Sequence, residues 1–319
     1  MPRYQVEQES MSTLRQWSVS KKGNNMDLTA SIIDYRRYLR RKNYSAHTVK
    51  NYLNRLKHFL TLLPVRVEAA TPGHVKNYLD HMLNKRMSPK TINEHLFAIR
   101  SFYRYLQEEE GRSLFNPAVK GMALRIPKPL PRYARSSELE SFLAVITKKR
   151  DRALFMIMLR CGLRVDEVAS LTLDAIDYHR CLIMVRSGKG AKDRATYISS
   201  DAVDALADYL AVRVPTRESK VFLVEKGTHK GKPLSVRGIQ KRMECYSKKS
   251  GVSITCHQLR HTMATQLLNA GADVVTIQEL LGHTKIEMTM RYSRLSNMKA
   301  QSDYYKAMER VIRGEYAKQ

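Results

Sequence analysis

The chain has 319 residues, 56 Lys and Arg against 30 Asp and Glu, and a formal net charge of +26 at pH 7. A hydrophobic content of 43% with only 14 glycines is typical of a globular rather than a disordered chain, and the length allows two domains with separate cores. The charge excess opposes self-association and favours a polyanionic partner, most often nucleic acid. Because the basic residues are spread along the whole chain, a long polyanion is favoured over an acidic membrane surface.

The cysteines and the N-terminal sequence indicate the cellular compartment. Cys161, Cys181, Cys245 and Cys256 lie far apart without a CxxC pair, which argues against a zinc ribbon or a disulfide framework. The N-terminal sequence lacks the apolar core of a signal peptide, and no segment approaches the length of a membrane span. We therefore expect a soluble, cytoplasmic protein without a membrane partner, and binding to DNA would make it nucleoid-associated.

Residues 1–25 are polar and predict a flexible leader, and residues 26–115 predict an all-helical domain. Within it, the segments 45–59 and 88–102 share a leading Ser, a Thr three residues later, a Leu eight later and an aromatic residue fourteen later. Ser at the head of each segment fits a helix N-cap, and Pro89 fits a first helical turn, as does Pro72 after Thr71. The repeat is compatible with a shared DNA-facing role and equally with the common pattern of capped amphipathic helices.

A proline-rich segment, 116–134, predicts an interdomain linker, and residues 135–319 predict a second domain. Helices open this domain, and a hairpin of two β-rich runs, 180–187 and 194–199, follows around a glycine-containing turn. Further helices reach the C-terminus, with glycines where helix C-caps fall. These glycines are Gly251, Gly271 and Gly282. The predicted fold class is mainly α with a small β-hairpin, an α+β chain.

Several titratable residues of the second domain have ordinary explanations when each is taken alone. Arg164 has Glu167 three residues on, and such a surface pair is worth only a few tenths of a kcal/mol. A lysine in a glycine-rich turn is usually solvated, and in "SGKGAKDR" both Lys189 and Lys192 are candidates for a special role. In "HQLRH", the first histidine and the arginine share a helix face, whereas His261 points elsewhere and is expected to pack or cap.

A metal site is not expected in this sequence. The "HQLRH" motif lacks the glutamate of a zinc HExxH motif, and Arg260 would place a fixed positive charge beside a cation. The residue types present are better suited to a metal-free attack on a phosphodiester, since they include arginines, a lysine, histidines and a tyrosine. Guanidinium forks bind the charged oxygens, a lysine protonates the leaving alkoxide, and tyrosine stores the phosphate as an ester. We therefore expect no metal and no cofactor.

The order and spacing of these residues carry a resemblance to a known family. In chain order the elements are G-L-R-x-x-E, a Lys in a β-turn, H-x-L-R-H, L-G-H, and a Tyr nine residues after the His of L-G-H. This set resembles the catalytic domain of the tyrosine recombinases, which are site-specific recombinases of the phage-integrase, Xer and Cre type. The helical segment resembles their SAM-like core-binding domain, and the resemblance implies a C-shaped clamp of two domains on DNA. With about 25 residues before the first helix, a simple two-domain member without an arm-binding domain is expected.

The resemblance also implies a role for each member of the motif set. The arginines would clamp the scissile phosphate, the turn lysine would protonate the leaving 5′-oxygen, and the histidines would hydrogen-bond the phosphate. The tyrosine would be the nucleophile, and the glutamate would orient the first arginine. The clamping arginines would be Arg164 and Arg260, and the proton-donating lysine would be Lys189. The histidines would be His257 and His283, the nucleophile Tyr292, and the orienting glutamate Glu167.

The function implied is site-specific DNA recombination on inverted half-sites, through a 3′-phosphotyrosine and a Holliday junction, without ATP. A homotetramer linked by its C-terminal helices is implied, and a partner recombinase or an accessory DNA-bending protein is compatible with it. Tyr305, Met308 and Ile312 lie at helical spacing in that tail, although a helix packed on its own domain would show the same pattern.

Two other functions remain open at the level of the sequence: a type IB topoisomerase that relaxes supercoils, and a DNA-binding regulator with a vestigial site. DNA contacts, most of them to phosphates, are expected from polar residues of the capped helices and from basic residues of the second domain. These residues are Thr48, Lys50, Arg55, Lys90, Thr91, Asn93, Arg100, Arg237, Lys241 and Arg242.

Overall fold

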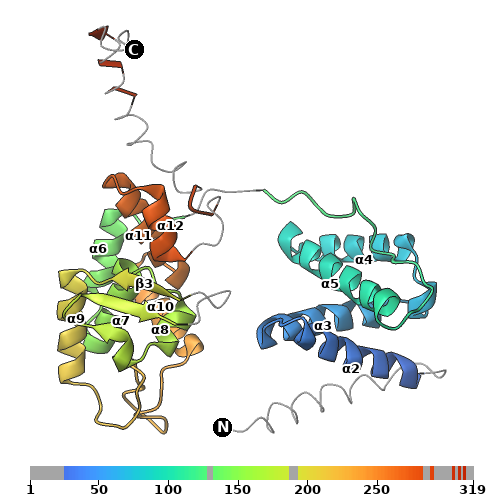
Figure 1. The fold of residues 1–319 in the computed structure, drawn as a ribbon, viewed down its shortest axis with the longest axis horizontal. Coiled ribbons are helices and arrows are strands. Elements are labelled where there is room, and N and C mark those ends of the chain that lie inside the picture. The colour runs from blue at the N-terminus through green and yellow to red at the C-terminus, as the bar shows by residue number, and fades with distance from the viewer. Residues whose placement is uncertain are drawn as a thin grey trace. The chain divides into compact units, whose positions relative to one another are not determined.

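The computed structural model describes residues 25–127, 132–186, 193–282 and 288–290, together with 304–305, 308–309 and 312–313. Contacts divide the chain into two compact units, Met1–Lys128 and Pro129–Gln319. Both units are mainly helical, and the second also holds a small sheet, as the sequence predicts (Figure 1). Within the described residues, no helix combines the length and the apolar character that crossing a bilayer requires.

The described part of the first unit consists of four α-helices and one short 3-10 helix. They are α2 (Asn25–Arg41), α3 (Ala46–Leu62), η2 (Val67–Ala69), α4 (Pro72–Asn84) and α5 (Pro89–Glu108). The hydroxyls of Ser45 and Ser88 each accept the backbone N–H of the threonine three residues on, at 3.2 Å. The predicted N-caps of α3 and α5 are confirmed, so the repeat in the sequence corresponds to a repeated capping geometry.

Buried aromatic residues form much of the core of the first unit. Tyr35 of α2 is fully buried, and its ring meets Phe102 of α5 edge-on, with 5.2 Å between centroids. Its hydroxyl donates to Ser101 Oγ at 2.9 Å, and the Tyr103 hydroxyl donates to the Val67 carbonyl at 2.9 Å. Since these two phenols have partners, both rings are buried without an unsatisfied hydroxyl.

Part of the segment predicted as a linker is attached to the first unit. Arg100 donates from Nε to the Ala118 carbonyl and from Nη2 to the Val119 carbonyl, both at 2.8 Å. Asn93 donates to the carbonyl of Leu124 and accepts its N–H, also at 2.8 Å. These side chains satisfy backbone groups of a segment that has no regular structure, and this holds residues 116–124 on α5.

In the described part of the second unit, other helices and a three-stranded sheet surround the buried helix α7. Its helices are α6 (Ser136–Ala144), α7 (Lys149–Arg160), α8 (Val165–Ser170), η3 (Leu173–Ala175), α9 (Ser200–Ala211), α10 (Val236–Ser250), α11 (Cys256–Asn269) and α12 (Val274–Leu281). Helix α7 is apolar nearly all round, with residues 153–159 all buried, which is the pattern of a helix covered on every side. Helices α10 and α12 end at Gly251 and Gly282 in left-handed conformation, as predicted for C-caps.

The strands run antiparallel in the order β1–β2–β3, with β1 (Ile176–Asp177), β2 (Leu182–Val185) and β3 (Arg194–Tyr197). Strands β2 and β3 are the predicted hairpin, whereas β1 is too short to give a periodic signal. The register pairs Val185 with Arg194, so this pair closes the described hairpin beside the turn. Helix α12 contacts β3 and α11, which brings the end of α12 next to the hairpin (Figure 1).

Candidate active site

Arg164 occupies the N-cap position of α8 and is held there by Glu167. The backbone N–H of Arg164 donates to Glu167 Oε2 at 2.7 Å, and Nη1 donates to Oε1 at 2.8 Å. The side chain of Arg164 remains 23% exposed. The predicted contact between the two residues is present, and the remaining donors of the fork are available to an anion at this surface.

Arg260, the fifth residue of α11, joins two segments that are distant in the sequence. It is only 1% exposed, and it donates from Nη1 to the Gly162 carbonyl and from Nη2 to the Leu281 carbonyl. Gly162 precedes Arg164 by two residues, and Leu281 is the last residue of α12. The side chain of Arg260 therefore ties α11 to the start of α8 and to the end of α12.

His257 lies one helical turn before Arg260, on the solvent side of α11. Its ring meets that of His261 edge-on, with 4.1 Å between centroids. His257 is an exposed residue, but partial desolvation lowers its pKa below the ordinary value, and the charges of Arg260 and Arg164 lower it further. The three side chains therefore interact electrostatically, and at neutral pH the imidazole is uncharged and able to donate and accept hydrogen bonds.

A residue that the sequence interpretation missed, Arg194, completes the surroundings of Glu167. Its Nη1 and Nη2 donate to the two carboxylate oxygens of Glu167, at 2.8 Å each, and its Nε donates to the Leu280 carbonyl at 2.9 Å. The alternation of side chains along β3 could have identified Arg194, because it lies on the same face of the strand as the fully buried Thr196. An arginine on an inward face needs a buried acid, and Glu167 was available.

The carboxylate of Glu167 is a permanent anion in this arrangement. Burial by itself would raise its pKa, but hydrogen bonds from Arg194 and Arg164 and the charges of both guanidinium groups lower it to about 2. Glu167 is therefore ionised at every physiological pH and cannot serve as a proton donor. Its position between two guanidinium groups is that of an orienting residue.

Three members of the predicted set, Lys189, His283 and Tyr292, lie outside the described residues, as does the alternative lysine, Lys192. The described chain reaches the flanks of two of them. Gly282 immediately precedes His283, and Arg194 follows Lys192 by two residues. The contacts of the described residues bring these parts together. Glu167 binds both Arg164 and Arg194, and Arg194 and Arg260 each bind a carbonyl at the end of α12.

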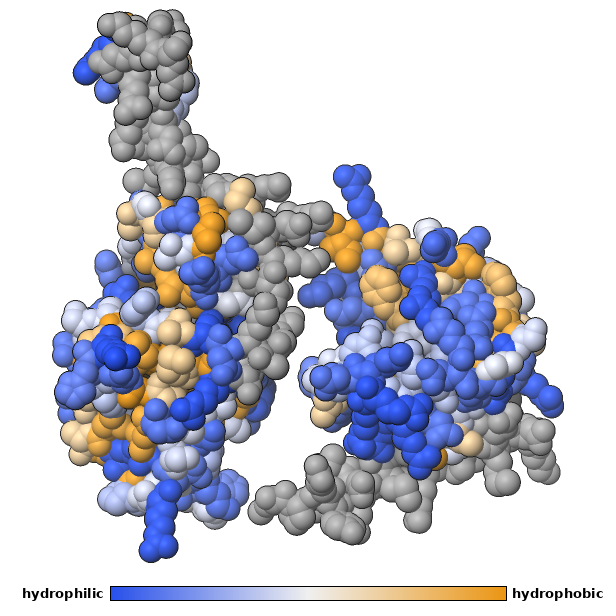
Figure 2. Space-filling model, viewed as in Figure 1, coloured by the Kyte–Doolittle hydropathy of each residue, from blue (hydrophilic) through white to orange (hydrophobic). Residues whose placement is uncertain are grey.

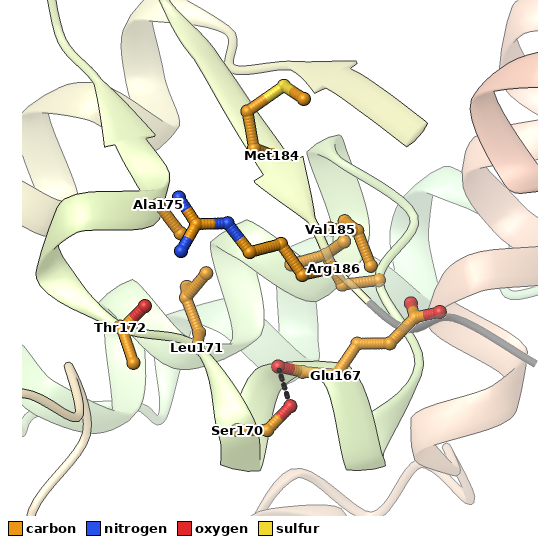
Figure 3. Close-up of a pocket in the computed structure, with 9 residues that line it drawn as sticks. Glu167, Ser170, Leu171, Thr172, Ala175, Met184, Val185 and Arg186 are labelled. Carbon is orange, nitrogen blue, oxygen red and sulfur yellow. Dashed lines mark hydrogen bonds between the residues drawn. The ribbon is translucent and has the colours of Figure 1, made fainter. Parts of the chain in front are cut away.

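A small pocket of about 60 Å³ lies between the α8–η3 segment and the end of β2, and Figure 3 shows the residues that line it. Glu167, Thr172 and Arg186 belong to its wall, but Arg164, His257 and Arg260 do not. The pocket is too small for a nucleotide, so the exposed surface around Arg164 and His257 is the better candidate for a phosphate. In the described part of the chain, no group of three or more His, Cys, Asp or Glu side chains is placed to hold a metal ion.

The predicted DNA contacts differ in how available their side chains are. Four of these residues are exposed: Lys50, Lys90, Arg237 and Lys241. Figure 2 shows that hydrophilic residues cover much of the visible surface of both units. Asn93 is 4% exposed and, like Arg100, binds backbone groups of its own unit. Four others are half-buried with protein partners: Thr48 and Thr91 with the capping serines, Arg55 with Glu94, and Arg242 with Asp151.

The chain matches two family models, Phage integrase family over residues 132–299 and Phage integrase, N-terminal SAM-like domain over residues 32–110. It is 32% identical over 268 residues to tyrosine recombinase XerA of Thermococcus kodakarensis, covering 83% of this chain and 90% of the relative. It is 34% identical over 285 residues to tyrosine recombinase XerC of a Shewanella species, covering 86% of this chain and 92% of the relative. A lambda integrase dimer bound to a COC′ core site has a similar fold, with a TM-score of 0.69, 17% identity and coverage of 82% of this chain and 94% of that chain.

Proposed function

Since the chain belongs to the phage integrase family and is a site-specific tyrosine recombinase, we propose that Tyr292 attacks the scissile phosphate of DNA while Arg164 and Arg260 bind it. The observation that carries the assignment is the convergence of Arg164, Arg260 and His257 at one corner of the second unit. Arg260 bonds to the carbonyl two residues before Arg164, and both guanidinium charges act on the imidazole of His257.

The proposed cleavage step needs only groups of this chain and DNA. The phenolic oxygen of Tyr292 forms a bond to phosphorus, and its proton passes to a histidine or to solvent. The bond between phosphorus and the 5′-oxygen breaks, and Lys189 donates a proton to that oxygen, leaving a 3′-phosphotyrosine and a 5′-hydroxyl. Guanidinium groups offset the negative charge that grows on the non-bridging oxygens. Rejoining is the reverse reaction with the 5′-hydroxyl of another strand, so no ATP is required.

The proposed substrate is double-stranded DNA with two inverted half-sites, cleaved and exchanged by a tetramer through a Holliday junction. The net charge of +26 supports binding to DNA. The two units are proposed to clamp the duplex, and the protein is proposed to act in the cytoplasm, associated with the nucleoid. In the tail, Tyr305 is 56% exposed and Ile312 is 79% exposed. Exposure of these apolar side chains supports docking of the tail onto a neighbouring subunit.

The covalent step is tested with a nicked duplex that carries an inverted repeat taken from the DNA beside the gene. The unaltered protein is expected to form a denaturant-resistant adduct with it. Tyr292→Phe should bind the duplex with the same affinity but form no adduct. Tyr304→Phe and Tyr305→Phe are matched controls, because both tyrosines are exposed and lie in the same tail. An adduct that persists in Tyr292→Phe would assign the nucleophile to another residue.

Recombination is separated from simple DNA relaxation by its dependence on a site. A supercoiled plasmid with two copies of the repeat should yield exchanged products, whereas a plasmid without the repeat should stay supercoiled. Efficient relaxation of the plasmid that lacks the repeat would favour a type IB topoisomerase. Specific binding without any adduct would favour a DNA-binding regulator.

A further inference from the structure

The described residues show an ion pair beside Arg164 in which one partner, Arg194, has no role in the proposed cleavage step. Arg194 and Glu167 form a two-bond fork, and their side chains are only 8% and 9% exposed. The third donor nitrogen of Arg194, Nε, binds the Leu280 carbonyl at 2.9 Å. All three nitrogens of Arg194 are therefore directed at protein oxygens, so this side chain links the segments that carry those oxygens.

The partners of Arg194 belong to three different segments of the site. Glu167 holds Arg164 at the start of α8 through bonds of 2.7 and 2.8 Å. Leu280 belongs to the last turn of α12, three residues before His283. Arg194 itself begins β3 and closes the hairpin through its pairing with Val185, five residues after Lys189. One side chain therefore joins the hairpin of the lysine to the segments of an arginine and a histidine.

We propose that Arg194 is a positioning residue for cleavage, which fixes the Lys189 hairpin against α8 and α12 through its fork to Glu167 and its bond to Leu280. This inference rests on the proposed function for the roles of Lys189 and His283. Its mechanism is geometric, since the segment that bears the acid is anchored next to the residue that orients the phosphate-binding arginine.

The close approach of Gly282 to Arg194 supports a tightly defined position for this side chain. A Cβ added to Gly282 would stand 2.9 Å from Arg194 Cδ and 3.3 Å from its Nε. Only glycine leaves room for the arginine stem at the end of α12. The backbone just before His283 and the stem of Arg194 are thus in direct contact, independently of the hydrogen bonds.

The experiment compares Arg194→Lys with Arg186→Lys in the full chain. Lysine keeps the charge but has one ammonium group, which cannot occupy both oxygens of Glu167 and the Leu280 carbonyl at once. Arg186 lies at the other end of the same turn, where its bond to Asp174 is solvent-exposed, with side chains 65% and 60% exposed. Adduct formation is timed on two nicked duplexes, one with an ordinary 5′-oxygen leaving group and one with sulfur in its place, which leaves without protonation.

Arg194→Lys is expected to bind DNA like the unaltered protein and to lose adduct formation on the oxygen substrate by on the order of 100-fold. On the sulfur substrate most of the rate should return, because the displaced acid is not needed there. Arg186→Lys should match the unaltered protein on both. Equal losses on the two substrates would overturn the inference in favour of a general structural role, and an unchanged rate would overturn it outright.

A second variant guards against misfolding of Arg194→Lys. Gly282→Ala keeps Arg194 and crowds its stem, whereas Gly251→Ala places a Cβ at another helix C-cap with nothing within 4 Å. Only Gly282→Ala should reproduce the loss on the oxygen substrate, and equal rates in both would contradict the inference. If the unaltered protein formed no adduct on either duplex, the proposed function itself would fail, which is distinct from a normal rate in Arg194→Lys.

Discussion

A methyl group at Gly162 is expected to damage both the stability of the second unit and the position of Arg260. Gly162 has a φ of +63°, and an added Cβ would stand 3.0 Å from Leu281 Cδ2 and 3.0 Å from Met263 Sδ. Both neighbours are buried, so neither can swing into solvent. The carbonyl of the same residue accepts the bond from Arg260 Nη1.

The magnitude of the effect of Gly162→Ala follows from two contributions. A left-handed conformation costs a non-glycine residue about 1–2 kcal/mol. Crowding of two core side chains adds about 1–3 kcal/mol. Gly251→Ala is the matched control in the same unit, because φ is +69° there but nothing lies within 4 Å of the added Cβ. The crowding contribution alone, about 1–3 kcal/mol, should therefore separate the two variants in free energy of unfolding.

Urea titration followed by circular dichroism measures this difference, and adduct formation on the nicked duplex measures its effect on catalysis. A shift of the Gly162 carbonyl should displace Arg260 and slow adduct formation on the order of 100-fold, with no such loss in Gly251→Ala. Equal destabilisation of the two variants, together with equal adduct rates, would refute the assignment of Gly162 as a close-contact support for Arg260.

Three further outcomes are expected. Lys189→Ala should cripple cleavage of ordinary DNA and recover on the substrate with the sulfur leaving group; absence of recovery would transfer the acid role to Lys192 or another residue. Adduct formation should survive EDTA, and its loss there would point to a metal requirement. Burial lowers the pKa of His95 to about 4, with help from the charges of His58 and Arg55, so the folded chain keeps this imidazole neutral where the unfolded chain protonates it. Its contribution to stability is complete above pH 6.5 and falls as the pH drops towards 4, by about 2 kcal/mol between about pH 7.5 and pH 5. His95→Gln should remove most of that pH dependence in urea titrations, and an unaltered slope would show that other groups cause it.

Local patterns in the sequence predict much of the fold. Ser45 and Ser88 mark the starts of α3 and α5, because an N-cap depends only on residues within one turn. The hairpin of β2 and β3 is likewise a local structure around a short turn. The boundary of the first unit was less predictable, since residues 116–124 contain proline but are held by Asn93 and Arg100 of α5. That attachment joins residues many positions apart and leaves no periodic signal.

The sequence by itself determined which residue types are present for the proposed chemistry and in what order they occur. It also determined the short-range pair of Arg164 and Glu167, which lie within one helical turn. Only the tertiary structure decided what surrounds that pair. Arg194 reaches Glu167 from a strand 27 residues later in the chain, and Arg260 reaches the carbonyls of Gly162 and Leu281 across separate elements. Such contacts depend on how helices and strands pack together, because a buried charge requires a partner but its sequence does not specify which one.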